Sequence, residues 1–194
     1  RVVVDPDGMV YLVIVNRMDW YFSSRDEYAI GWCQLGHGGG LSRHRELLTL
    51  GWSFYYSNVA ACYRDPGKLE IVYTHNSTPY LTTLAIESGA ATTQRLPILE
   101  GYSVPYGLIE VMRWRGATHV VLISGDFRYR ELGYYSIDDV DGRCRYEMLR
   151  IQGDDVRQIA LLDAVISADG DLVFAVNIRT EHILYLCQQP LDKI

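Results

Sequence analysis

Four stretches of the chain share one pattern, in which a glycine turn is followed by an almost unbroken apolar run. They are VDPDGMVYLVIVNR (4–17), RDPGKLEIVYTHN (64–76), WRGATHVVLISGD (114–126) and ISADGDLVFAVNIR (166–179). Their turn glycines are Gly8, Gly67, Gly116 and Gly170, which are 59, 49 and 54 residues apart. Runs without polar alternation predict strands that are covered on both faces of a sheet, because a strand with one wet face alternates.

A second landmark recurs with a similar spacing. Apolar segments run into Gly51, Gly101 and Gly153, which are 50 and 52 residues apart, in LLTLGWS, LPILEGYS and MLRIQGDD. Two unrelated landmarks with one period indicate an internal repeat. A repeat of roughly 40 to 50 residues that is built from strands is typical of a propeller blade.

Each repeat divides into four predicted strands that are separated by turn residues. In the second repeat these are residues 58–63, 69–74, 80–87 and 92–99, and in the third they are 108–114, 119–124, 132–137 and 145–151. The fourth repeat stops in its third strand, HILYLCQ (182–188). The segment DDVRQIALLDAVISADG (154–170) has near-helical apolar spacing, but the repeat register makes its second half a first strand. We follow the register, since local propensity is the weaker signal.

The sequence therefore predicts an all-β fold, a β-propeller with about four blades of four antiparallel strands in this chain, the last blade being incomplete. A single β-propeller domain over 1–194, or part of a larger one, is expected, with blades at about 1–52, 53–102, 103–153 and 154–194. Because the ring is short by one strand, we expect association with further blades or subunits.

With its acidic Asp-Gly turns, this pattern resembles the β-propeller superfamily, and in texture the sialidase-like propellers. The stretch SADGDLVF (167–174) comes closest to the sialidase Asp box, S-x-D-x-G-x-x-W. It departs from that motif because no residue separates Asp169 from Gly170, and because it lies between a first and a second strand. The resemblance implies arginines that bind a carboxylate, and Arg17 and Arg179 occupy matching positions in the first and fourth repeats.

In a propeller, equivalent loops gather at one end, and here the loops after the second and fourth strands carry many aromatic residues. The chain has 15 Tyr and 4 Trp against 4 Phe, and Tyr and Trp combine an apolar body with a polar tip that suits recognition. We expect a ligand-binding face here. Its predicted residues are Arg17, Trp20, Tyr21, Trp52, Tyr55, His75, Tyr102, Tyr106, Phe127, Tyr129, Arg179 and His182.

Composition excludes several classes of partner. The net charge of −6 argues against nucleic acid, and no run of about 20 apolar residues could span a bilayer. The four cysteines form no CxxC pair and are expected to be small buried thiols, and the histidines have no metal-ligand spacing. HGGG (37–40) is expected to be a hairpin loop, because no G-x-S-x-G elbow or phosphate loop accompanies it. We therefore predict no cofactor and no metal site.

These observations favour a non-catalytic binding or assembly module that recognises carbohydrate or a protein partner. One alternative is a sialidase-like glycoside hydrolase or polysaccharide lyase, which needs two carboxylates across a cleft. Its candidates are Asp19, Asp26, Glu27, Asp126, Asp154, Asp155 and Glu181. Another alternative is a purely structural subunit. An extracellular or virion location is expected from fold analogy alone.

Overall fold

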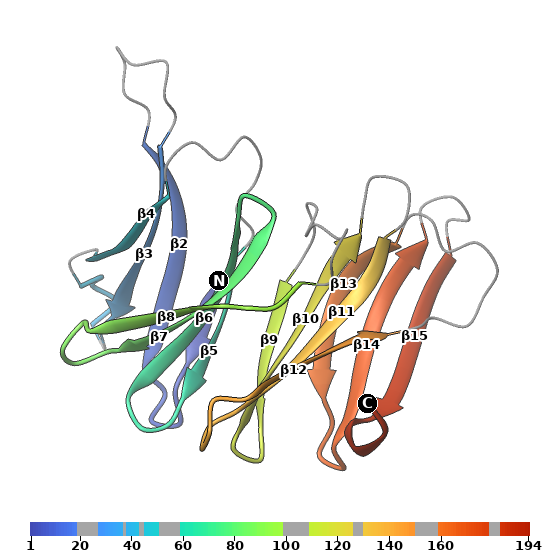
Figure 1. Cartoon of the computed structure of the whole chain (residues 1–194). Helices are drawn as coiled ribbons and strands as arrows, with labels where there is room; N and C mark the ends of the chain where they lie inside the picture. The colour runs from blue at the N-terminus through green and yellow to red at the C-terminus, as the bar shows by residue number, and fades with distance from the viewer. Residues whose placement is uncertain are drawn as a thin grey trace. The chain divides into compact units, whose positions relative to one another are not determined.

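The computed structural model (Figure 1) describes residues 1–18, 27–36, 38–42, 45–50, 59–98, 109–125, 130–149, 159–178 and 183–194. These residues form four antiparallel sheets, three of four strands and one of three. Sheet 1 contains β1 (Val2–Val4), β2 (Val10–Met18), β3 (Glu27–Leu35) and β4 (Arg45–Leu50). Sheet 2 contains β5 (Val59–Arg64), β6 (Lys68–His75), β7 (Thr78–Ala85) and β8 (Ala91–Arg95). Sheet 3 contains β9 (Ile109–Trp114), β10 (Ala117–Gly125), β11 (Arg130–Asp138) and β12 (Cys144–Leu149). Sheet 4 contains β13 (Ile159–Ile166), β14 (Asp171–Ile178) and β15 (Ile183–Pro190), followed by the 3-10 turn η1 (Leu191–Lys193).

The all-β class and the four antiparallel sheets are confirmed, and β13 is a strand where local spacing alone would have favoured a helix. All four turn glycines have positive φ: 80° at Gly8, 58° at Gly67, 77° at Gly116 and 91° at Gly170. Side chains with a Cβ rarely adopt this backbone conformation, which explains the glycine at each repeat. A closed propeller is not detected among the described residues, so the ring remains a prediction.

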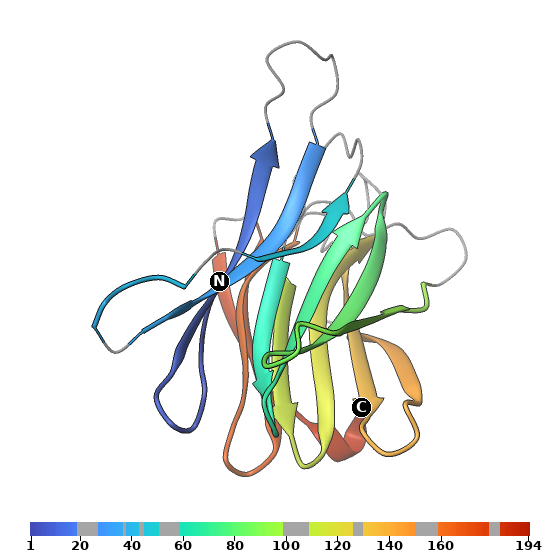
Figure 2. The same cartoon turned by 90° about the vertical axis from the view of Figure 1, so that its left-hand side faces the viewer.

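The chain divides into two compact units. Unit 1 comprises 1–76 and 80–94, and unit 2 comprises 77–79 and 95–194. In unit 1, β5 lies against β1 and β2, so that sheet 2 packs on one face of sheet 1. Figure 2 shows the same strands from the side, with sheet 1 in blue and sheet 2 in green. The shared core contains Val3, Tyr11, Val13, Ile30 and Trp32 from sheet 1, and Leu69, Ile71, Tyr73 and Leu84 from sheet 2.

Unit 2 repeats this arrangement with different residues. The first strand of its second sheet, β13, lies against β9, β10 and β11. The shared core contains Val121, Ile123, Leu132, Tyr134 and Leu149 from sheet 3, and Leu161, Ala164, Leu172, Phe174 and Val176 from sheet 4. In both units, therefore, the first strand of one sheet packs across the face of the preceding sheet.

The prediction that every second strand is covered on both faces is correct for β6 and for β10, where Thr118 to Ile123 are all buried, but wrong for β2 and β14. In β6, Leu69 to Tyr73 are all buried. In β2, Ile14 is 39% exposed, and in β14 Val173 and Ala175 are only partly buried. Each of these two strands has one face on which no other described segment packs closely enough to bury its side chains. None of the four cysteines forms a disulfide, and only Cys33 is fully buried.

Candidate functional site

Most of the predicted loop face lies outside the described residues. This holds for Trp20, Tyr21, Trp52, Tyr55, Tyr102, Tyr106, Phe127, Tyr129, Arg179 and His182, and for the carboxylates Asp19, Asp26, Asp126, Asp154, Asp155 and Glu181. For Arg17 and Glu27 only the backbone, in β2 and β3, is described. The ligand-binding face and the glycosidase pair are therefore neither confirmed nor contradicted.

His75 is the one predicted site residue whose side chain is described. It ends β6 and is partly buried, and its Nε2 lies 3.1 Å from Nδ2 of Asn76. Its Nδ1 is buried, and no hydrogen-bond partner for it is found among the described residues. Asn76 and Ser77 have positive φ values of 48° and 59°, which form the tight turn into β7.

The structure contains a pocket in unit 2 that the sequence analysis did not anticipate. Its volume is about 250 Å³, slightly below the roughly 300 to 1,000 Å³ of drug-sized sites, so it suits a single ring. It is lined by Trp114, Arg115, Ala117, His119, Tyr134, Ser136, Arg145, Glu147, Leu191, Asp192 and Ile194. Except for Arg115 in the β9–β10 turn and the C-terminal residues, they all belong to the face of sheet 3 that also packs on sheet 4.

Strand register explains why these side chains converge. His119 on β10 pairs with Ser136 on β11, which pairs with Arg145 on β12. The next row of the same face contains Val121, Tyr134 and Glu147. Because side chains at alternate positions of a strand share a face, two adjacent cross-strand rows supply the polar wall.

Two buried rings, those of His119 and Tyr134, lie at the base of the pocket. His119 is 5% exposed and Tyr134 is 4% exposed. Nδ1 of His119 lies 2.6 Å from Oη of Tyr134, and the rings stack with centroids 5.9 Å apart. Nε2 of His119 is buried, and among the described residues it has no hydrogen-bond partner. A buried polar group without a partner is costly, but the backbone of Trp114 acts on the same ring as a hydrogen-bond partner that raises its pKa, so the imidazole is not wholly unsatisfied within the chain.

Burial disfavours the charged form of both members of the pair. Burial lowers the pKa of His119, Arg113 acts in the same direction, and the backbone of Trp114 opposes them. Burial raises the pKa of Tyr134 to about 12, assisted by the nearby charge of Glu147 and opposed by Ser136. Two neutral rings joined by one hydrogen bond leave one further polar hydrogen available, on either Nε2 or the phenol.

The apolar side of the pocket is held in place by packing. The Arg115 guanidinium lies 5.1 Å from the centroid of the Trp114 indole. A Cβ added to Gly170 would meet that indole at 3.4 Å, so the β13–β14 turn packs closely on it. The backbone N–H of Leu191 donates to the carbonyl of Gly170 at 3.2 Å, which positions η1 beside the same turn.

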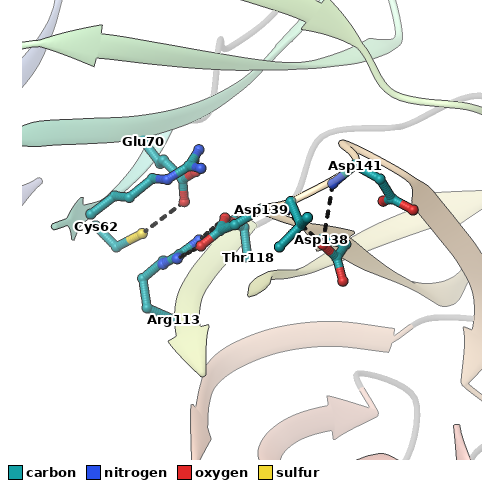
Figure 3. A network of polar contacts seen from close by, with 9 residues as sticks. Cys62, Glu70, Arg113, Thr118, Asp138, Asp139 and Asp141 are labelled. Carbon is teal, nitrogen blue, oxygen red and sulfur yellow. Dashed lines mark hydrogen bonds and ion pairs between the residues drawn. The ribbon is translucent and has the colours of Figure 1, made fainter. Parts of the chain in front are cut away.

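The opposite face of sheet 3 carries a polar cluster that ties β9 to the β11–β12 turn (Figure 3). The Arg113 guanidinium donates to both carboxylate oxygens of Asp139 and to Oγ1 of Thr118. In the turn, Oδ1 of Asp138 accepts the N–H of Val140 at 2.7 Å. This cluster supports the strands from which His119 and Tyr134 project.

Figure 3 also shows a buried carboxylate in unit 1. Glu70 is 1% exposed, and its Oε1 lies 3.0 Å from Nη1 of Arg64. The thiol of Cys62 donates to Oε2 at 3.9 Å. Burial of a carboxylate is expensive without such partners. We interpret this group as structural, because its oxygens are engaged by residues of the same sheet.

Among the described residues, no group of three or more His, Cys, Asp or Glu side chains is placed to hold a metal ion. Within the same residues, no helix is long and apolar enough to cross a membrane.

The pocket could not be predicted from the sequence because its residues are dispersed over five elements. One signal was present: His119 interrupts the apolar run THVVLIS at a position where the other repeats have Tyr11, Glu70 and Val173. A polar ring inside a strand that is buried on both faces needs a partner, and that partner, Tyr134, is known only from the strand register.

Comparisons with known proteins do not indicate a family or a function for this chain. No family model matches the sequence, and no curated protein matches it. A crystal structure of a protein of unknown function from Bacteroides caccae matches with a TM-score of 0.47 and 10% sequence identity. The match covers 100% of this chain and 61% of that one, so this chain spans about three-fifths of that protein's length.

Proposed function

We propose that this protein is a non-catalytic binding module built from propeller-type blades, and that it recognises carbohydrate by holding one sugar ring in the unit 2 pocket. One observation carries the proposal: the pocket wall places hydrogen-bond donors and acceptors side by side over a buried His119–Tyr134 pair. The predicted aromatic loop face remains part of the proposal as a second contact region for a longer glycan.

The balance of charges in the pocket favours a neutral polyhydroxylated ligand. Arg115 and Arg145 are donors only, whereas Glu147 and Asp192 accept hydrogen bonds when ionised. A phosphate or sulfate would face two carboxylates as well as two guanidinium groups. A sugar hydroxyl both donates and accepts, so it satisfies either kind of group, while Trp114 and Leu191 provide apolar contact for its C–H surface.

The propeller part of the proposal is supported by the repeated packing mode. In unit 1 and in unit 2 the first strand of one sheet crosses the preceding sheet, and the two cores use side chains at corresponding positions. Blades that stack face to face in this way need apolar residues on both faces of their central strands. That requirement accounts for the unbroken apolar runs.

A glycan array followed by calorimetry with the best ligand tests this function. Replacing Arg145→Gln removes a charged donor from the wall, and we expect binding to weaken roughly tenfold to a hundredfold, the usual effect of losing a charge-assisted hydrogen bond. Glu147→Gln should also weaken it. Arg143→Gln is the matched control, because Arg143 is 85% exposed in the β11–β12 turn and does not line the pocket.

Three results would count against the proposal. They are an array without any bound glycan, equal affinities for the Arg145→Gln and Arg143→Gln variants, and turnover in a parallel hydrolysis screen. Turnover would favour the sialidase-like alternative and overturn the non-catalytic assignment.

A further inference from the structure

Two sheet faces, one in each unit, carry exposed apolar side chains. The β1 face comprises Val2, Val4, Val10, Leu12 and Ile14 of sheet 1, where Val2 is 65% and Val4 57% exposed, Val10 and Leu12 are partly buried, and Cys33, the β3 partner of Leu12, is buried. The β15 face comprises Val165, Val173, Ala175, Leu184 and Leu186 of sheet 4, where Leu184 is 65% and Leu186 76% exposed, and the same face also carries the polar residues Asp163, Asn177 and Gln188. Contiguous exposed apolar side chains of this kind mark interaction surfaces, since scattered ones would be unremarkable.

The repeat shows which kind of face each one is. Within units 1 and 2, one sheet contributes residues three and five positions after its turn glycine: Tyr11 and Val13, or His119 and Val121. The next sheet contributes residues two, four and six positions after its own glycine. These are Leu69, Ile71 and Tyr73 in unit 1, and Leu172, Phe174 and Val176 in unit 2. In each unit, therefore, the interface joins two kinds of face. The three-five face carries the residues three and five positions after a turn glycine, and the two-four-six face carries the residues two, four and six positions after one.

The two exposed faces are the unused halves of the same interface. Val173 and Ala175, on the β15 face, are three and five positions after Gly170. Val10, Leu12 and Ile14, on the β1 face, are two, four and six positions after Gly8. The β15 face therefore has the character of the surface that receives a following sheet, and the β1 face has the character of the sheet that is received.

Residues at equivalent positions of the repeat are buried in sheet 3 and exposed in sheet 4. Leu132 in sheet 3 pairs with Ile123, and Leu184 in sheet 4 pairs with Asn177, which has the same place in the repeat. Leu132 is 0% exposed and Leu184 is 65% exposed. In the same way Tyr134 is 4% exposed and its counterpart Leu186 is 76% exposed. Covering these leucines would contribute about 25 cal/mol for each Å² of apolar surface removed from water.

We propose that the β15 face of one molecule packs on the β1 face of a second copy of this chain, head to tail, with the geometry of the internal sheet pairs. A face of one kind complements the other kind rather than itself, so the contact is heterologous. Repetition of a heterologous contact produces a closed ring when the rotation closes. The exposed leucines and valines are then interface residues.

The test uses sedimentation equilibrium on the 22.1 kDa chain and two charged variants. The first carries Leu184→Glu and Leu186→Glu, and the second carries Val2→Glu and Val4→Glu. All four side chains are more than half exposed, so the substitutions should leave each fold intact, which circular dichroism checks. Val140→Glu is the control, because Val140 is 95% exposed in the β11–β12 turn and lies on neither face.

We expect the wild type and the Val140→Glu control to self-associate, and each double variant alone to be monomeric. A one-to-one mixture of the two double variants should form a dimer, because the intact β1 face of one still fits the intact β15 face of the other. A monomeric wild type, a double variant that still self-associates, or a mixture that stays monomeric would each overturn the head-to-tail contact. Glycan binding is measured separately on the monomeric variants, so the two proposals can fail independently.

Discussion

The same place in the repeat is filled with different side chains in the two units. In unit 1 it holds Tyr11 and Trp32, which are 4% and 5% exposed, with ring centroids 6.5 Å apart. In unit 2 it holds His119 and Tyr134, beside a pocket of about 250 Å³. The backbone environment is alike, so the difference lies in side-chain volume and polarity.

The two positions also differ in the hydrogen bonds that their side chains make. Oη of Tyr11 donates to Oδ2 of Asp5 at 3.0 Å, and Asp5 comes from the turn of the same sheet. The corresponding turn of sheet 3 is Arg115–Gly116, which has no carboxylate, and Nε2 of His119 is left without a partner among the described residues. The comparison teaches that one unit uses this position to complete its core, whereas the other leaves a pocket beside it.

The largest expected effect concerns the burial of equivalent leucines by a neighbouring sheet. Leu132→Ala should lower the free energy of unfolding by about 2 to 5 kcal/mol, because Leu132 is 0% exposed. Leu184→Ala, at the equivalent position of sheet 4, should lower it by less than about 0.5 kcal/mol in dilute, monomeric protein. Urea denaturation of both variants measures this. Equal losses would show that the two positions are covered to the same extent in solution.

The second effect concerns the pocket. Replacing His119→Tyr together with Tyr134→Trp gives unit 2 larger rings, like those of unit 1, and should partly fill the cavity. We expect glycan affinity to fall at least tenfold, and stability to change by about 1 to 3 kcal/mol because of local overpacking. Isothermal titration calorimetry measures the affinity. Trp32→Phe in unit 1 is the control, and binding that survives the double replacement would place the sugar elsewhere.

The third effect is a pH dependence that only unit 2 should show at this position. The pKa of His119 is lowered below 6.5, so near and below that pH the unfolded chain binds a proton more readily than the folded one. Stability therefore decreases as the pH falls through this window, by at most about 1.4 kcal/mol per pH unit. The difference between wild type and His119→Gln in chemical denaturation at pH 5 to 8 isolates this contribution, and parallel curves would contradict it.

The smallest effect compares two turns. The carboxylate of Asp5 accepts the N–H of Asp7 and Met9 and the hydroxyl of Tyr11, whereas Oγ of Ser167 accepts only the N–H of Asp171 among the described contacts. Asp5→Ala should therefore cost about 1 to 2 kcal/mol, and Ser167→Ala about 0.5 kcal/mol. Thermal unfolding measures both.

The Asp5 contact can also be followed by the titration of Tyr11. Burial, with the Asp5 hydrogen bond and charge as further causes, raises the pKa of Tyr11 to about 12. Asp5→Asn should lower that pKa in an ultraviolet titration. An unchanged tyrosine titration would mean that burial alone is responsible.

Much of the fold could be predicted from the sequence because the signals are local and repeated. The four glycines at positive φ, the apolar runs after them and the three-stranded final sheet all follow from spacing along the chain. The strand β13 was predicted only because the repeat register outweighed its helix-like spacing. The predicted loop face lies almost wholly outside the described residues, so it stays a prediction.

The sequence by itself determined the number of sheets, their strand order and the identity of the turn residues, since hydrophobic alternation and backbone conformation act over a few neighbouring residues. Only the tertiary structure decided which apolar faces are covered, and that His119 meets Tyr134 while Leu184 and Leu186 meet solvent. Burial depends on which sheet packs next to which, and a hydrophobic pattern reads the same whether its face is buried or exposed. Because the pattern does not depend on coverage, β2 and β14 were expected to be covered on both faces, and the structure shows that they are not.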